Sequence, residues 1–370
     1  MMKLLGRQEE FEIKVRKVRS LLRSLEVDGI LISEQHGFAW ITCGGDNHIS
    51  LYGPGGSGSV LITEDGAYLL CSNVETWRLK EEEVMGLPLE IRDFNWHDSS
   101  EETLLRDILG SGTLGTDIPR PDCKDVSQAL LPLRYSLLPQ EVERMEWLGR
   151  HAESALRQAC LKAEPGDSEF ELAGRVAEAC YERKLLPMLT LVAVDERIEQ
   201  VRHPIPTDKE MDHTAMLVLC ARRWGLYANL TRLIRFGVID SDLRRRHDAV
   251  TRIDAGMIAA SRVGTPYKDI FHRAVELYRQ EGFPEDWRKL HQGGSTGYAG
   301  RYFFTNPFCE EKILDSQAIA WNPAIDGTKS EDTLIVTQNA ITVVTEARDW
   351  PKITHEVEGL MIPRPDILVR

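Results

Sequence analysis

The chain lacks the cysteine pattern of a disulfide-stabilised or zinc-binding domain. It holds seven scattered cysteines, at positions 43, 71, 123, 160, 180, 220 and 309. An odd number of cysteines without a Cys-x-x-Cys pair argues against a complete disulfide framework, and no Cys/His group has zinc-ligand spacing. We therefore expect reduced thiols, most of them buried.

Long hydrophobic runs are also missing. No stretch approaches the roughly 20 apolar residues that a membrane-spanning helix needs. The N-terminal sequence MMKLLGRQEEFEIKVRKV has no apolar core followed by a small-residue cleavage site, as a signal peptide would have. These absences predict a cytoplasmic protein that does not act at a membrane.

Net positive charge is lacking, because acidic residues outnumber basic ones by 58 to 45 and give a formal net charge of −13. Such an excess of acidic residues disfavours non-specific binding to nucleic acid. One basic run, Arg244–Arg246, interrupts it, but this run lies in an amphipathic segment and is typical of a solvated helix face. We do not expect a nucleic-acid partner.

What is present is enough chain for two domains, because 370 residues exceed one ordinary core. Residues 1–136 alternate between helix and strand patterns, which predicts a small α/β domain. A helix is expected at 8–26 and a hairpin turn at Asp65-Gly66. Short strands are expected at 29–33, 38–42, 59–63, 67–72 and 113–118.

Residues 137–370 form the second predicted domain. Pro139 suits the first turn of a helix that continues to about Lys162, and Ser168-x-x-Glu171 is a capping box that begins another. Strands and two further helices follow, so that the order of helix, helix and strands occurs twice. This order favours antiparallel sheets covered by helices, an α+β fold. The later elements are expected at 189–195, MLVLCARR, YANLTRLIRF, 241–262, 267–281, AIAWN, TLIVT and AITVVTEA.

Five motifs follow one another in the order of a known superfamily: FAWITCGG, EPGDSEFELAGRV, VRHPIPTD, GLYANLTRLIRFG and AWNPAIDGTKSEDTLIVT. In this order they resemble the creatinase, prolidase and aminopeptidase P superfamily, peptidase family M24, over nearly the whole chain. The resemblance implies a pita-bread domain at 137–370, preceded by a smaller creatinase-type α/β domain at 1–136. It also implies a homodimer.

The resemblance further implies positions for metal ligands, because the superfamily's metallopeptidases hold two divalent ions with two Asp, one His and two Glu. The matching positions carry Val218, Asn229, Gly294, Asn322 and Glu331. Valine and glycine offer no side-chain ligand, and asparagine ligates weakly through its carbonyl oxygen. These residue types predict neither a dinuclear metal site nor a cofactor.

Creatinase is the superfamily's metal-independent precedent, and it relies on a histidine at the position of His203. We expect His203 to act as general acid and base, with Glu331 fixing a substrate cation or activating water. Two alternatives stay open. In the first, His203 is a hydrogen-bonded structural histidine. In the second, Glu331 is a buried salt-bridge partner of Arg232 or Lys329.

The segment LHQGGSTGYAGRYFF, residues 290–304, replaces the superfamily's metal-histidine loop. Arg301 is a candidate for gripping a substrate carboxylate with two parallel hydrogen bonds. Alternatively, the segment is a glycine-rich turn that closes a degenerate pocket, or His291 joins His203 and Glu331 in a mononuclear metal site. Candidate substrate-binding residues are His291, Tyr298, Asn229, Asn322 and Trp321. For Trp321, the alternative is a position in the core.

Three functions are compatible with these residues. The favoured one is a metal-independent, creatinase-like hydrolase that cleaves a C–N bond in a small nitrogenous or amino-acid-like substrate. The second is an aminopeptidase or dipeptidase of Xaa-Pro type that uses metal. The third is a non-catalytic pita-bread module that binds peptides or proteins. The expected partner is thus a small molecule or a short peptide.

Overall fold

The computed structural model describes residues 6–370, which fold into two compact units. The first unit runs to Glu141 and also includes Trp224–Leu226. The second comprises Val142–Arg223 and Tyr227–Arg370. The domain boundary between residues 136 and 137 stays a prediction. Within residues 6–370, no helix has the length and apolarity needed to cross a membrane.

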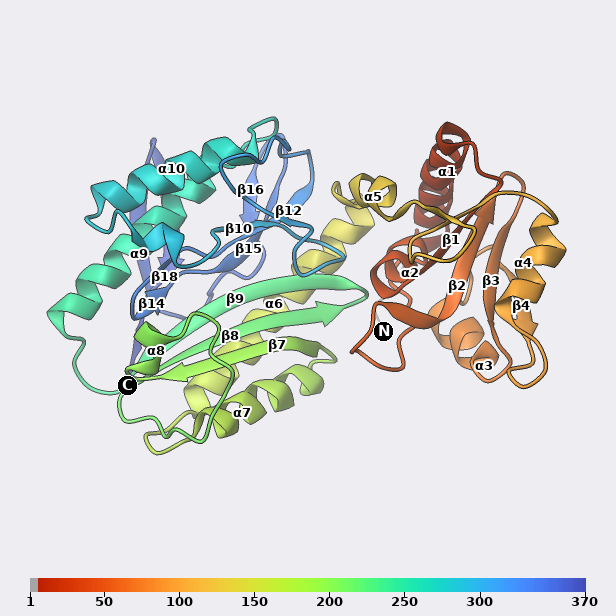
Figure 1. The fold of residues 1–370 in the computed structure, drawn as a ribbon. Helices are drawn as coiled ribbons and strands as arrows, with labels where there is room; N and C mark the ends of the chain where they lie inside the picture. The colour runs from red at the N-terminus through yellow and green to blue at the C-terminus, as the bar shows by residue number, and fades with distance from the viewer. Residues whose placement is uncertain (1–5) are drawn as a thin grey trace. The chain divides into compact units, whose positions relative to one another are not determined.

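The first unit contains a six-stranded mixed sheet with strand order β4-β3-β2-β1-β5-β6 (Figure 1). Its strands are β1 (Gly29–Glu34), β2 (Gly55–Thr63), β3 (Ala67–Ser72), β4 (Glu90–Phe94), β5 (Leu114–Thr116) and β6 (Lys124–Asp125). Its helices are α1 (Arg7–Leu25), α2 (Gln35–Ile41), α3 (Thr76–Arg78), α4 (Glu101–Leu109) and α5 (Ser127–Leu130), with a short π-helix at Leu79–Glu83 and a short 3₁₀-helix at Leu131–Arg134. Strands β1, β2 and β3 pair antiparallel, whereas β4, β5 and β6 join the sheet in parallel.

The structure confirms the predicted N-terminal helix and the Asp65-Gly66 hairpin, which joins β2 to β3. The predicted strand at 38–42 is wrong, because these residues belong mostly to helix α2. The run Phe38–Ile41 is buried on every side. A short, fully buried apolar run has no periodicity that separates a strand from a helix.

The first half of the second unit is a four-stranded sheet of order β19-β9-β8-β7, with helices α6 and α7 beside it (Figure 1). Helix α6 (Pro139–Lys162) begins at the predicted proline. Helix α7 (Glu169–Glu182) begins with the predicted capping box, in which Ser168 and Glu171 bond each other's backbone N–H groups. The strands are β7 (Leu186–Val194), β8 (Thr214–Arg223), β9 (Leu226–Arg235) and β19 (Leu368–Val369), and the short helix α8 is Arg197–Gln200.

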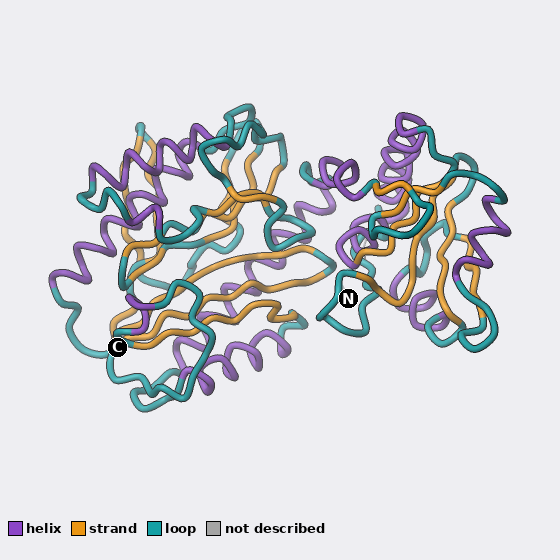
Figure 2. Tube along the Cα trace, in the orientation of Figure 1, coloured by secondary structure: helices purple, strands orange, loops and turns teal. Residues whose placement is uncertain are grey.

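The second half repeats this order of two helices followed by a sheet, as Figures 1 and 2 show. Helices α9 (Ser241–Ala260) and α10 (Tyr267–Gln280) share a buried core with a five-stranded sheet. The sheet strands are β11 (Phe303–Phe304), β10 (Gly293–Ser295), β12 (Gln317–Trp321), β15 (Asp332–Val336) and β16 (Ile341–Val343), in spatial order. The predicted α+β repeat is therefore confirmed.

Three features of the second unit were not predicted. Strands β17 (Lys352–Val357) and β18 (Leu360–Pro365) form a separate hairpin, and β19 pairs in parallel with β9. The sequence predicts a strand within 340–347 as the last element. Between β12 and β15, a small hairpin of β13 (Ala324–Ile325) and β14 (Thr328–Lys329) turns the chain back on itself.

Candidate functional site

The register of β12 and β15 builds the candidate site. These strands pair antiparallel with Trp321 opposite Asp332, so Asn322 and Glu331 stand together at the ends of the two strands. Strand β9 approaches from the other sheet: the Thr231 N–H donates to the Glu331 carbonyl oxygen at 3.2 Å. The Asn229 N–H donates to Thr333 Oγ1 at 2.7 Å. The two halves of the unit thus meet at Glu331.

The Glu331 carboxylate lies between two cations. Its Oε2 is 2.7 Å from Lys329 Nζ and accepts a hydrogen bond of 2.7 Å from Thr231 Oγ1. Its Oε1 is 3.2 Å from Arg301 Nη2. Burial opposes ionisation, but the charges of Lys329 and Arg301 outweigh it and hold the pKa of Glu331 below its ordinary value. Glu331 is therefore ionised, and both its oxygens are engaged.

Two histidines lie next to this ion pair. The ring centroids of His203 and His291 are 6.0 Å apart, and the His291 ring is 4.2 Å from that of Phe304. Burial, followed by the positive charges of Arg301 and Lys329, lowers the pKa of His291 to about 4. His291 is consequently neutral near pH 7, whereas His203 is exposed to solvent.

Buried polar atoms without a hydrogen-bond partner within residues 6–370 occur on four residues of this site. They are Asn229 Nδ2, Asn322 Oδ1, His291 Nδ1 and Arg301 Nε. The side chains of Asn229 and Asn322 are almost wholly buried. Leaving such an atom unpaired costs about 1–3 kcal/mol, so these atoms need a ligand or water as partner.

The structure thus brings together His203, His291, Arg301 and Glu331, four of the residues that the sequence singles out. For Glu331 it shows the salt-bridge arrangement, with Lys329 as partner; Arg232 pairs instead with Asp332, at 3.1 Å. The sequence names Lys329 only as a possible partner of Glu331. The position of Lys329, two residues before Glu331 in the sequence, is the one signal that could have assigned Lys329 to the site.

Trp321 and Tyr298 are placed differently from a pocket lining. Trp321 is fully buried in the core of α9, α10 and their sheet, and its Nε1 donates to Ser261 Oγ at 2.9 Å. The core role that the sequence left open for Trp321 is the one that the structure shows. Tyr298 is also fully buried, and its backbone N–H donates to Tyr302 Oη at 2.9 Å.

Two helix-helix-strand halves that meet at a buried polar cluster define a protein of the pita-bread class. The chain matches Metallopeptidase family M24 over residues 143–338, which is more than half of its length. It therefore belongs to this family of peptidase-type hydrolases.

Solved structures share the fold. The prolidase from Pyrococcus horikoshii OT3 is 18% identical with a TM-score of 0.77, and the likeness covers 90% of this chain and 98% of that one. The Xaa-Pro dipeptidase from Bacillus anthracis is 16% identical with a TM-score of 0.78, covering 97% and 100%. The N-terminal domain of FACT complex subunit SPT16 from Cicer arietinum (chickpea) is 12% identical with a TM-score of 0.69, covering 94% and 96%. No curated protein matches the chain.

At the positions that the resemblance assigns to metal ligands, the side chains present do not fit a pair of divalent ions. Val218 packs in an apolar cluster with Leu191 and Met216. A Cβ atom at Gly294 would collide with the carbonyl oxygen of Phe303, which leaves no room for a ligating side chain. Both Glu331 oxygens are occupied by cations and Thr231. Within residues 6–370, no group of three or more His, Cys, Asp or Glu is arranged to hold a metal ion.

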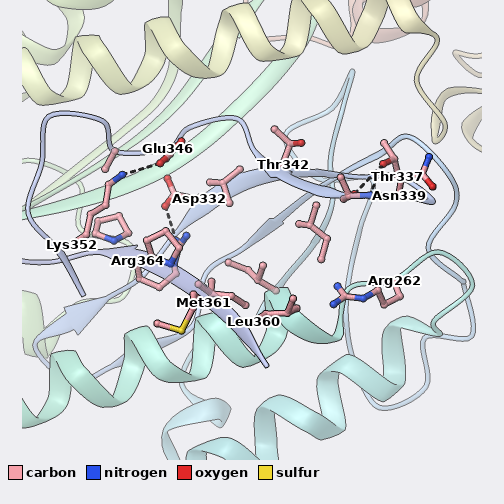
Figure 3. A pocket seen from close by; sticks show the side chains of 18 of the residues that line it. Arg262, Asp332, Thr337, Asn339, Thr342, Glu346, Lys352, Leu360, Met361 and Arg364 are labelled. Carbon is pink, nitrogen blue, oxygen red and sulfur yellow. Dashed lines mark hydrogen bonds and ion pairs between the residues drawn. The ribbon is translucent and has the colours of Figure 1, made fainter. Parts of the chain in front are cut away.

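A cavity of about 580 Å³ lies elsewhere in the second unit, lined by β16, β18 and the end of α9 (Figure 3). Its lining includes Asp332, whose carboxylate faces Arg364 at 2.6 Å, and the Lys352–Glu346 ion pair at 2.8 Å. The lining contains neither Glu331 nor either histidine of the site. This cavity is thus separate from the cluster around Glu331.

Proposed function

We propose that the protein is a metal-independent hydrolase that cleaves a C–N bond in a small nitrogenous or amino-acid-like substrate, as creatinase does. One observation carries the proposal: Lys329 and Arg301 flank Glu331, with His203 and His291 beside them. In a metallopeptidase, bound ions supply positive charge and an activated water. Here the chain's own cations supply the charge, and imidazoles are available for proton transfer.

Each residue has a role in the proposed reaction. Neutral His291 accepts a proton from water, whose oxygen forms a bond to the substrate carbon. His203, facing solvent, donates a proton to the leaving nitrogen as the C–N bond breaks. The positive charge of Arg301 and Lys329 stabilises the negative charge that develops on the substrate oxygen. Glu331 holds these two cations in place and does not act as a base.

The proposed partner is a small molecule or a short peptide. Imidazole rings and two largely buried cations recognise small polar groups, and the charge of −13 continues to argue against nucleic acid. The homodimer and the cytoplasmic location stay predictions from the sequence.

The test measures hydrolysis of small amides, ureido compounds and Xaa-Pro dipeptides by the purified protein, with and without a chelator. We expect turnover that a chelator leaves unchanged, and a loss of about 100-fold in kcat/KM for His203→Ala. Because His203 is exposed, this variant should unfold at the same denaturant concentration as the wild type.

Two results would overturn the proposal. Activity that appears only with added manganese or cobalt would identify an Xaa-Pro metallopeptidase instead. Binding of small ligands without turnover of any of them would identify a non-catalytic binding module.

A further inference from the structure

The charge of the Glu331 cluster constrains what can bind there. Two cations, Lys329 and Arg301, face one carboxylate, and His291 is neutral, so the cluster carries surplus positive charge. Glu331 is only 4% exposed, and its two oxygens already hold both cations and the Thr231 hydroxyl. An incoming guanidinium or ammonium group would have to displace one of these cations. The site is therefore unfavourable for a positively charged substrate group.

The unpaired asparagine atoms add a second constraint. Asn229 Nδ2 is a donor and Asn322 Oδ1 is an acceptor, and both lack a partner within residues 6–370. A neutral amide or ureido group offers the complementary pair, a carbonyl oxygen that accepts and an N–H that donates. A guanidinium group offers only donors, so it leaves Asn229 Nδ2 unsatisfied.

Arg301 supplies a third constraint. Its Nη2 contacts Glu331 and its Nη1 donates to the Gly300 carbonyl oxygen, while its buried Nε has no partner within the described chain. A carboxylate that approaches Arg301 would satisfy Nε and neutralise the surplus charge of the cluster. The exposed Phe304 ring is tilted against the ring of His291, with centroids 4.2 Å apart, and provides an apolar wall beside that histidine.

We propose that the substrate is an anion in which a neutral amide or ureido C–N bond is joined to a carboxylate, the class of N-acyl and N-carbamoyl amino acids. This inference rests on the proposed function and reverses the polarity expected from creatinase, whose substrate carries a guanidino cation. Hydrolysis of such a compound needs only water: the carbonyl carbon gains the water oxygen, the C–N bond breaks, and the amine leaves with the proton.

A matched pair of ligands tests the polarity. N-carbamoylglycine and guanidinoacetate have nearly the same shape, but the first carries a carbonyl oxygen where the second carries a cationic nitrogen. Titration calorimetry with the His203→Ala variant measures binding without turnover. We expect N-carbamoylglycine to bind at least about tenfold more tightly than guanidinoacetate, and its glycinamide analogue, which lacks the carboxylate, to bind about tenfold more weakly than N-carbamoylglycine.

Variants assign the carboxylate to Arg301. Arg301→Gln should lower affinity for N-carbamoylglycine by about tenfold or more and leave affinity for the glycinamide analogue unchanged. Arg301→Lys keeps the charge but loses the planar fork, so its affinity for N-carbamoylglycine should lie between those of the wild type and Arg301→Gln. Arg262→Gln is the matched control, since it removes one exposed arginine charge at the cavity of Figure 3 and should leave both affinities unchanged.

Three results would overturn the inference: equal or tighter binding of guanidinoacetate, no binding of N-carbamoylglycine or N-acetylglycine at millimolar concentration, or equal loss of both probes in Arg301→Gln. Failure of the proposed function looks different. If the wild type binds N-carbamoylglycine with this selectivity but does not hydrolyse it, the ligand class stands and the hydrolase does not.

Discussion

Glu331 and Asp332 are neighbours in sequence, yet they belong to two different kinds of polar cluster. Asp332 Oδ1 meets Arg232 at 3.1 Å and Thr345 Oγ1 at 2.7 Å, and its Oδ2 meets Arg364 at 2.6 Å. Arg364 also pairs with Asp254 at 2.7 Å. Around Asp332, two arginines face two aspartates, all nearly inaccessible to solvent.

The difference between the clusters is one of charge balance and access. Unpaired atoms occur in both, since Asp254 Oδ1 and Arg232 Nε also lack partners within residues 6–370. The Asp332 cluster is neutral in its direct ion pairs, so it needs no further charged group. The Glu331 cluster has surplus positive charge and an exposed histidine beside it. Successive side chains of a strand point to opposite faces, so one strand end supports a structural network and a candidate site together.

The largest expected effect comes from breaking the balanced cluster. Arg364→Met leaves Asp254 and Asp332 buried without their shared cation, and we expect a loss of about 3–5 kcal/mol in the free energy of unfolding, measured with urea. Arg262→Met, at an exposed arginine of the same unit, should change stability by no more than about 0.5 kcal/mol. A loss below about 1 kcal/mol for Arg364→Met would show that the two clusters do not differ in this way.

A smaller loss is expected at Glu331. Glu331→Gln leaves Lys329 and Arg301 without a counter-charge, which should lower the free energy of unfolding by about 1–3 kcal/mol and tighten the binding of N-carbamoylglycine. Lys329→Met combined with Glu331→Gln should recover part of the stability, because the pair is then removed together. Strictly additive losses in the double variant would mean that the two residues are not coupled.

A third effect depends on pH and concerns protons on the Asp332 side. Burial is the largest cause that lowers the pKa of His247 and of His355 to about 4, whereas the ordinary value is 6.5. Between about pH 6.5 and pH 4 the unfolded chain therefore binds protons that the folded chain does not. Stability is fully present above pH 6.5 and is lost as the pH falls through this window.

Thermal unfolding at several pH values checks this dependence. The midpoint should fall from pH 6.5 to pH 4, and His355→Gln should make the fall shallower while keeping a hydrogen bond to Thr251 Oγ1, which His355 contacts at 2.9 Å. An unchanged slope in His355→Gln would contradict the assignment of this residue as a neutral buried histidine.

How much the sequence could predict depended on whether the signal was local. The cap at Ser168, the proline at the start of α6 and the repeated order of helix, helix and strands gave the fold of the second unit correctly. The buried run Phe38–Ile41 gave the wrong element, because burial on all sides removes periodicity. The β17–β18 hairpin was missed because Pro363 and Pro365 lie in an edge strand, where proline is tolerated.

The candidate site was predictable only in part. His203, Arg301 and Glu331 stand in motifs, so their grouping could be expected from the family's order of segments. The salt-bridge partner of Glu331 was left open between Arg232 and Lys329, because the two-residue strand β14 and the turn before it set the direction of Lys329, and no sequence period reveals such a short hairpin. Trp321, next to Asn322, is a core residue because its side chain points to the helices.

The metal content of the protein, measured together with its activity, tests most directly whether the Glu331 cluster works without metal. Protein incubated with manganese, cobalt or zinc and then dialysed should retain no stoichiometric metal at the Glu331 cluster, and its hydrolysis of an N-acyl or N-carbamoyl amino acid should be the same with and without a chelator. Retention of one or more divalent ions per chain that Glu331→Gln abolishes, with activity that depends on them, would contradict it.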